Sequence, residues 1–191
     1  MPITRRNLLG LLSSSTFFLT VAPVRALTAP LPVDSLPLDF PQGVASGDPQ
    51  PNGIMLWTRA EPATPTDGPI NLLLQVSTER DFSTLLLQEQ LHTDANADYT
   101  VRTYINGLTL DTQYYYRFLG GHRFDGDDTT EGEQSVSRTG RTRTAPLPGE
   151  PRRVNLAFAS CQSCEQGYYA SWARMLADDR AAPQEDRIHF V

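Results

Sequence analysis

The chain has 191 residues, enough for one ordinary domain or for one small domain together with part of another. Its formal net charge is −6, and all 16 of its Lys and Arg residues are arginines. Because the chain is acidic and has no basic stripe, its composition argues against a nucleic-acid-binding surface. A hydrophobic content of 39% predicts a folded core, and two cysteines are too few for a disulfide scaffold.

Residues 1–26 have the layout of an export signal. Arg5 and Arg6 precede an apolar run, and small residues at Val24 and Ala26 mark a cleavage site. Paired arginines indicate the twin-arginine export machinery as a partner and predict a periplasmic or extracellular protein. An ordinary secretory signal or an uncleaved anchor is the alternative, although serines interrupt the run and it falls short of the roughly 20 apolar residues that a spanning helix needs.

A proline-containing tether is expected over residues 27–39, and a β-domain over residues 40–145. Turn residues separate four runs that read as strands, over 54–59, 72–77, 99–105 and 114–118. The run over 99–105 alternates at period two, which places Val101 and Ile105 on one face. Short strands at this spacing predict a mainly β fold, a β-sandwich of the immunoglobulin or fibronectin III type.

Two features of the β-domain have both a structural and a functional interpretation. Residues 125–133 are acidic, but their spacing does not match a helix–loop–helix calcium site, so a solvated hairpin tip is favoured. Trp57 and the run from Tyr114 to Tyr116 are assigned to the core rather than to a carbohydrate-binding platform. Residues 85–87 are assigned to a strand because the run is short.

Residues 146–152 are rich in proline and read as a linker, and residues 153–191 read as the opening strand–helix–strand of an α/β layer. Residues 154–159 are expected to form a buried strand, and residues 188–191 the next parallel one. Between them, Ser163 and Gln166 form a capping-box pattern for a helix that ends near Pro183. Apolar residues at three- and four-residue steps predict a helix face packed on the sheet: Tyr168, Tyr169, Trp172, Met175 and Leu176.

Cys161 follows the first of these strands and is expected beside the start of the helix, a position that suits a thiolate nucleophile or metal ligand. Cys161 and Cys164 together have the spacing of a thiol–disulfide oxidoreductase pair, which is one alternative function. A buried structural role is the other interpretation of each thiol, and it is the favoured one for Cys164. His189 is assigned to the strand rather than to a metal site.

Several separated blocks resemble the bacterial alkaline phosphatase D family. Residues 40–49 and 56–59 resemble the start of its amino-terminal domain, residues 140–144 resemble the closing segment of that domain, and residues 158–162 and 165–168 resemble the first motif of its metallophosphatase domain. The leader agrees with the resemblance, because the family is exported through the twin-arginine pathway. The blocks occur in the family's order from Arg5 to Val191.

The resemblance implies a phosphate-ester hydrolase that acts chiefly on diesters, with monoesterase and phospholipase D-type activity, and that uses an iron–calcium centre. Cys161 is the position that matches the family's cysteine ligand to iron. The family's next block, Gly-Asp-x-x-Tyr, and its later metal ligands have no counterpart in the chain. We therefore expect a fragment that is inactive by itself and does not bind the metals stably. A non-catalytic sandwich binding module remains the third hypothesis.

Overall fold

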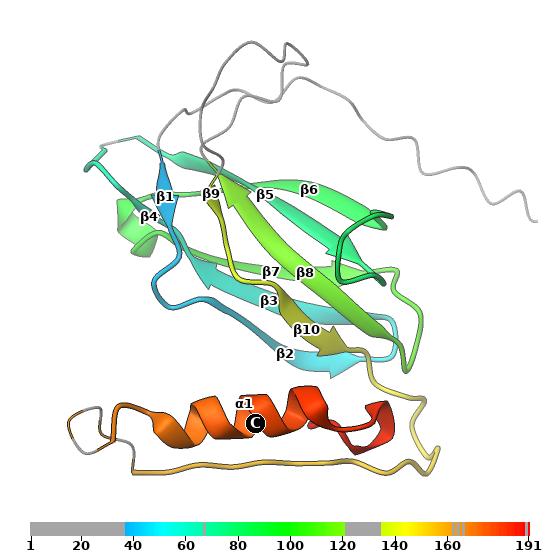
Figure 1. The fold of residues 1–191 in the computed structure, drawn as a ribbon. Coiled ribbons are helices and arrows are strands. Elements are labelled where there is room, and N and C mark those ends of the chain that lie inside the picture. Colours follow the sequence, from blue (N-terminus) through cyan, green and yellow to red (C-terminus); the bar gives the residue numbers. More distant parts are fainter. Residues whose placement is uncertain are drawn as a thin grey trace, which may run out of the picture. The chain divides into compact units, whose positions relative to one another are not determined.

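The computed structural model describes residues 37–66, 68–120, 135–161, 163, 165, 167–189 and 191 (Figure 1). The described residues all belong to one unit of the chain, Leu31–Val191. The predicted leader, with Arg5, Arg6 and Ala26, lies outside the described residues, as do the acidic residues 125–133.

Strands dominate the described part of the chain up to Arg143, and one α-helix follows. The elements are β1 (Leu38–Asp39), β2 (Val44–Gln50), β3 (Gly53–Arg59), β4 (Glu61–Pro62), β5 (Ile70–Ser77), β6 (Leu87–Thr93), the 3-10 turn η2 (Ala95–Ala97), β7 (Thr100–Asn106), β8 (Gln113–Gly120), β9 (Ser135–Val136), β10 (Gly140–Arg143), α1 (Ala170–Ala181) and the 3-10 turn η3 (Gln184–Asp186). The mainly β class predicted from the sequence is confirmed.

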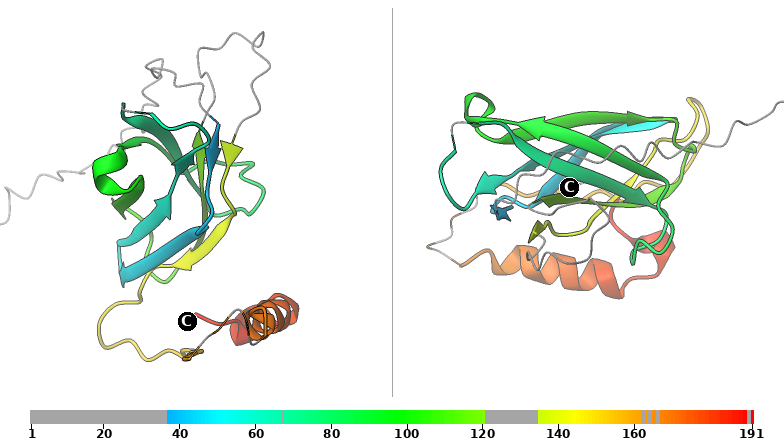
Figure 2. Two further views of the ribbon diagram at one scale, coloured as in Figure 1. Left: turned by 90° about the vertical axis from the view of Figure 1, so that its left-hand side faces the viewer. Right: turned by 90° about the horizontal axis from the view of Figure 1, so that it is seen from above.

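All strand pairs are antiparallel, and they form two main sheets. One sheet has the order β2-β3-β7, and the other has the order β10-β8-β5-β6, with β9 paired to β8 beyond the end of β10. The short strands β1 and β4 form a separate pair. The ribbons of the main sheets lie in two layers (Figures 1 and 2).

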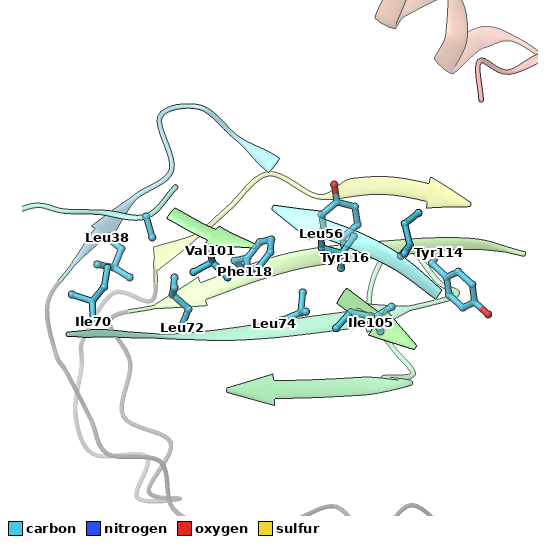
Figure 3. Close-up of a cluster of buried hydrophobic side chains, with 13 residues drawn as sticks. Leu38, Leu56, Ile70, Leu72, Leu74, Val101, Ile105, Tyr114, Tyr116 and Phe118 are labelled. Atoms are coloured by element: carbon cyan, nitrogen blue, oxygen red, sulfur yellow. The ribbon is translucent and has the colours of Figure 1, made fainter. Parts of the chain in front are cut away.

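The hydrophobic core contains side chains from both main sheets, as Figure 3 shows. Leu56 of β3 and Ile105 of β7 contribute from one sheet, and Leu74 of β5 and Phe118 of β8 contribute from the other. In β7, Val101 and Ile105 are buried while Arg102 is exposed, which is the alternation that the sequence predicts. The apolar face of each sheet is therefore removed from water against the other.

The tyrosine run divides between core and surface, because alternate residues of a strand face opposite ways. Tyr114 and Tyr116 are buried, and Tyr115 between them is half-buried. Trp57 is also half-buried and does not belong to the core, so its assignment to the core was wrong. It lies on the face of β3 opposite Leu56.

Two separate strands, β9 and β10, pair with the same side of β8. β9 pairs with the end of β8 and β10 pairs with its beginning. Between them, the Ser137 backbone N–H donates to the Phe118 carbonyl at 2.9 Å, and the Phe118 N–H donates to the Ser137 Oγ at 2.9 Å. The Ser137 side chain therefore satisfies a backbone group of β8 where a regular strand would have done so.

The β-region extends beyond the boundary expected at its start. Leu38 and Asp39, which the sequence assigned to the tether, pair with Pro62 and Glu61, and Leu38 is buried. Hydrogen bonding continues as far as Ala145, whose N–H donates to the Gln50 carbonyl at 3.1 Å. Leu85 and Leu86 precede β6 and are exposed, so of the predicted strand at 85–87 only Leu87 is in a strand.

The strand–helix–strand expected over residues 153–191 is a helix without its strands. Residues 154–160 form no strand beyond a single bridge residue at Leu156, and Phe158 is 96% exposed. Residues 188 and 189 form no strand either. A strand is stabilised only by the backbone and side chains of its neighbours, and the described residues offer no sheet at this place.

The helix also begins later than the capping box predicts. α1 starts at Ala170, after Tyr169, which has a left-handed φ of 57° and makes no side-chain cap. Its apolar stripe is not a core: none of its residues is buried, although Trp172 and Met175 are half-buried. Its end at Ala181, shortly before Pro183, agrees with the sequence. In the described part of the chain, no helix has the length and apolar character to cross a membrane.

Candidate functional site

Cys161 is an exposed free thiol in the segment between β10 and α1. Its backbone has a left-handed φ of 53°. α1 begins at Ala170, so the helix starts later after Cys161 than the sequence predicts. Cys164, the second thiol of the hypothetical redox pair, lies outside the described residues.

Metal binding can be tested against the donor atoms present. Over the described residues, no group of three or more His, Cys, Asp or Glu side chains comes together. A single thiolate does not form an iron centre, and calcium needs six or more oxygen ligands. The described residues therefore do not by themselves form an iron or calcium site.

The structure brings together a set of charged residues that the sequence interpretation did not single out. Asp111, in the turn before β8, accepts from Arg143 Nε of β10 at 3.0 Å. The Asp111 backbone carbonyl accepts from Arg143 Nη2 at 2.7 Å, and Arg152 also forms an ion pair with the Asp111 carboxylate. These contacts attach the end of the predicted linker to the β-region.

A second ion pair joins β10 to α1. The Asp179 side chain is only 8% exposed and lies 2.9 Å from Arg141 Nη2. Asp179 Oδ1 also accepts from the Ile188 N–H at 2.7 Å, and Arg141 Nη2 donates to the Ile188 carbonyl at 3.1 Å. Burial by itself raises the pKa of Asp179, but the hydrogen bonds from Arg141 and Ile188 outweigh it and hold the pKa below its ordinary value.

His189 lies beside these arginines. The ring Nδ1 of His189 accepts from the Asn155 backbone N–H at 3.0 Å, and the backbone N–H of His189 donates to the Asn155 carbonyl at 2.9 Å. Its Nε2 is 3.2 Å from Arg152 Nη2. Since Nδ1 is an acceptor, the neutral ring carries its proton on Nε2, so the contact with Arg152 brings two donors together and is not a hydrogen bond. Burial lowers the pKa of His189, and the positive charges of Arg152 and the neighbouring arginines lower it further.

A groove of about 710 Å³ lies along β2, β10 and α1. Its charged lining consists of guanidinium groups and one carboxylate, from Arg80, Arg141, Arg143, Arg180, Arg187 and Asp179. Its apolar lining includes Trp172, Met175 and Leu176 of α1. Only one part of this lining could be read from the sequence: Arg141 and Arg143 flank the buried Thr142 at period two, so they share a face of β10.

The β-region of the chain, together with the residues just before it, matches a known protein family. The family model described as "PhoD-like phosphatase, N-terminal domain" matches residues 27–146. The chain therefore belongs to the PhoD-like phosphatase family and carries the amino-terminal domain of that family.

Two relatives agree with this assignment. Alkaline phosphatase D of Bacillus subtilis (strain 168) is 31% identical over 142 residues, which are 71% of this chain and 22% of the relative. A solved structure described as "Structure of PhoD" superposes with a TM-score of 0.62 at 29% identity, over 83% of this chain and 28% of that one. The chain thus spans less than a third of the length of either relative.

Proposed function

We propose that this chain is the amino-terminal region of a phosphoesterase that hydrolyses phosphate diesters and monoesters. The observation that carries the proposal is the family match over residues 27–146, together with the structural similarity to PhoD. We assign four parts to this region: a leader over residues 1–26, a β-domain over 38–145, a linker over 146–152 and the start of a metallophosphatase domain over 153–191. Phospholipase D-type activity is included because the resemblance implies it.

The metal chemistry is part of the same proposal. Cys161 would bind iron through its thiolate, a soft ligand, and calcium would take oxygen ligands from other parts of a longer protein. Such metals supply an activated oxygen nucleophile and polarise phosphoryl oxygens. Cys161 is exposed in this chain, so its thiolate is accessible to a metal ion whose other ligands come from elsewhere in a longer protein.

The proposal is tested by hydrolysis of bis(4-nitrophenyl) phosphate with this chain and with the same chain extended by the reading frame after Val191. We expect activity only from the extended protein. In that protein, Cys161→Ser should abolish bound iron and activity together, while Ser163→Ala leaves both unchanged. No hydrolysis by the extended protein, or full iron content in Cys161→Ser, would contradict it.

Export by the twin-arginine pathway, to the periplasm or beyond, is a separate proposal based on residues 1–26. Its test is cell fractionation. Arg5→Lys together with Arg6→Lys should retain the protein in the cytoplasm, because the receptor reads the arginine pair. Arg25→Lys, beside the expected cleavage site, is the matched control and should be exported. Export of the paired variant would contradict the assignment.

We also assign the two sheets to the immunoglobulin or fibronectin III type. The support is the order of β2-β3-β7 against β10-β8-β5-β6, and a tyrosine near the start of β8. The Tyr114 hydroxyl accepts from the Thr109 N–H at 2.8 Å, a few residues upstream, as in the tyrosine corner of such sandwiches.

The redox alternative is not favoured. It requires Cys161 at a helix amino terminus, where the thiolate is stabilised, and α1 begins at Ala170 instead. The binding-module hypothesis predicts that removal of residues 154–191 changes nothing, and the hydrolysis assay on the extended protein decides against it if activity is found.

A further inference from the structure

A cleft of about 520 Å³ lies between β6 and β7. The strand order makes β6 an edge of one main sheet and β7 an edge of the other (Figure 1). The two strands meet at one end, where Thr93 Oγ1 donates to the Thr100 carbonyl at 2.8 Å, but they do not pair with each other. Edge strands carry backbone N–H and C=O groups that have no partner strand, so such groups border this cleft.

The backbone of β6 is regular enough to accept another strand. Its pairing with β5 keeps one register from Leu87, opposite Val76, to Thr93, opposite Ile70, without a bulge. β6 also contains no proline and no lysine. Bulges, prolines and lysines are common devices that keep an edge strand from pairing. An extended polypeptide can therefore add to the free edge of β6 through main-chain hydrogen bonds.

One charged side chain of β6 faces the inside of the sandwich. Leu87 and Leu91 pack against the hydrophobic core, and Glu89 between them lies on the same face and is half-buried. Over the described residues, no ion pair includes Glu89. Glu89 also lines the cleft. Further burial of this carboxylate by a ligand would be unfavourable unless the ligand supplied a cation.

The same carboxylate distinguishes between two occupants of the edge. A second copy of the chain, paired through its own β6, would bury two further unpaired carboxylates, and inward-pointing charges prevent such pairing. A strand with a basic residue opposite Glu89 would instead form a cross-strand pair of opposite charges. The edge therefore discriminates against self-association and favours a basic segment. The net charge of −6 attracts such a segment as well.

We propose that the edge of β6 binds an extended polypeptide segment of a partner protein, which adds to the sheet as a strand and places a Lys or Arg side chain against Glu89. Leu91 and the buried Val101 of β7 line the same cleft, so an apolar residue two positions from the basic one has a surface to contact. The inference concerns recognition and does not rest on the proposed hydrolysis. Its failure would leave that activity untouched.

The test is titration of the isotope-labelled 191-residue chain with the peptide acetyl-Thr-Val-Thr-Lys-Thr-Val-Thr-amide. The backbone amide signals of β6 are followed in NMR spectra. We expect saturable binding that shifts these signals and that weakens with salt. The same peptide with Glu in place of Lys should bind at least about fivefold more weakly, because it places like charges opposite each other.

Variants of the chain test the role of the carboxylate. Glu89→Gln keeps the size of the side chain and should weaken binding of the Lys peptide about fivefold. Glu150→Gln removes the same charge at an exposed position outside the cleft and should leave the affinity unchanged. Glu89→Lys should reverse the preference, so that the Glu peptide binds more tightly than the Lys peptide.

Four results would overturn the proposal. Without saturable binding of the Lys peptide there is no site, and with equal affinity for the two peptides there is no preference for a basic segment. Signal shifts at another strand but not at β6 would place the peptide elsewhere. Shifts of the β6 signals when the chain alone is concentrated would identify a second copy as the occupant.

Discussion

Gly53 of β3 illustrates how closely two strands approach at a single residue. A Cβ atom at this position would lie 2.5 Å from the Ile105 carbonyl oxygen and 2.5 Å from the Tyr104 hydroxyl oxygen. Because a backbone carbonyl of β7 cannot move aside, Gly53→Ala should lower the free energy of unfolding by about 1–3 kcal/mol. Gly47→Ala is the control, as nothing lies within 4 Å of its Cβ. Urea unfolding followed by circular dichroism measures both, and equal stability of the two variants would contradict the close approach.

Tyr114 is a core residue whose side chain ends in a hydroxyl group. Its ring is 2% exposed, and its hydroxyl accepts from the Thr109 N–H. Tyr114→Phe leaves that donor without its partner and should cost about 1–3 kcal/mol of unfolding free energy. Tyr104→Phe changes an exposed tyrosine and should stay within about 0.5 kcal/mol of the parent. Thermal unfolding of both variants decides, and a stable Tyr114→Phe protein would remove the support for a tyrosine corner.

His189 gives the attachment of the carboxyl-terminal segment a pH dependence. Its pKa in the folded protein is below the ordinary 6.5, so the folded state favours the neutral ring. Its contribution is therefore complete above pH 6.5 and declines as the pH falls toward the lowered pKa. The protection of the Asn155 amide against hydrogen exchange, relative to its intrinsic rate at each pH, should fall as the pH is lowered over that range, because this amide donates to His189 Nδ1. His189→Asn should remove this dependence while His92→Asn keeps it. A flat profile in the parent protein would contradict the contact.

At the scale of elements, an ion pair joins α1 to β10. None of its residues is buried, but Asp179 meets Arg141 of β10 and the Ile188 amide. Arg141→Gln should release this end of the helix, because it leaves a buried carboxylate without its cation. The measurement is amide exchange at Ile188, which should accelerate about tenfold or more, as loss of a charged hydrogen bond implies. Arg174→Gln breaks only the exposed pair with Asp178 and should have no effect. Unchanged exchange in Arg141→Gln would show that the helix is attached otherwise.

The strands with apolar runs were predictable, and the more polar edge strands β2 and β6 were not. The runs at 54–59, 72–77, 99–105 and 114–118 correspond to β3, β5, β7 and β8, which are the strands that contribute most to the core. β2 contains Gly47 and Pro49, and β6 alternates leucines with glutamines and a glutamate. Such edge strands gain their structure from a neighbour rather than from their own propensity, so local sequence did not reveal them.

Across the whole molecule, the need for a neighbouring strand also explains why the β-region was predicted better than residues 153–191. Residues 154–159 have the composition of a buried strand, but Phe158 is 96% exposed, because apolar character alone does not supply a pairing partner. The cysteine was recognised by resemblance, whereas the arginine-lined groove depends on residues far apart in sequence, such as Arg80 and Arg180. Spacing along the chain cannot bring such residues together before the fold is known.

The central claim is that this chain is the amino-terminal region of a PhoD-like phosphoesterase. The most direct measurement is to sequence the nucleic acid after the Val191 codon and translate it in the three forward frames. We predict a Gly-Asp-x-x-Tyr block close to the Ile188–Val191 segment, followed by a coding region that restores the length of its relatives. A stop codon with no such block in any frame would contradict the claim, and the chain would have to be explained by binding alone.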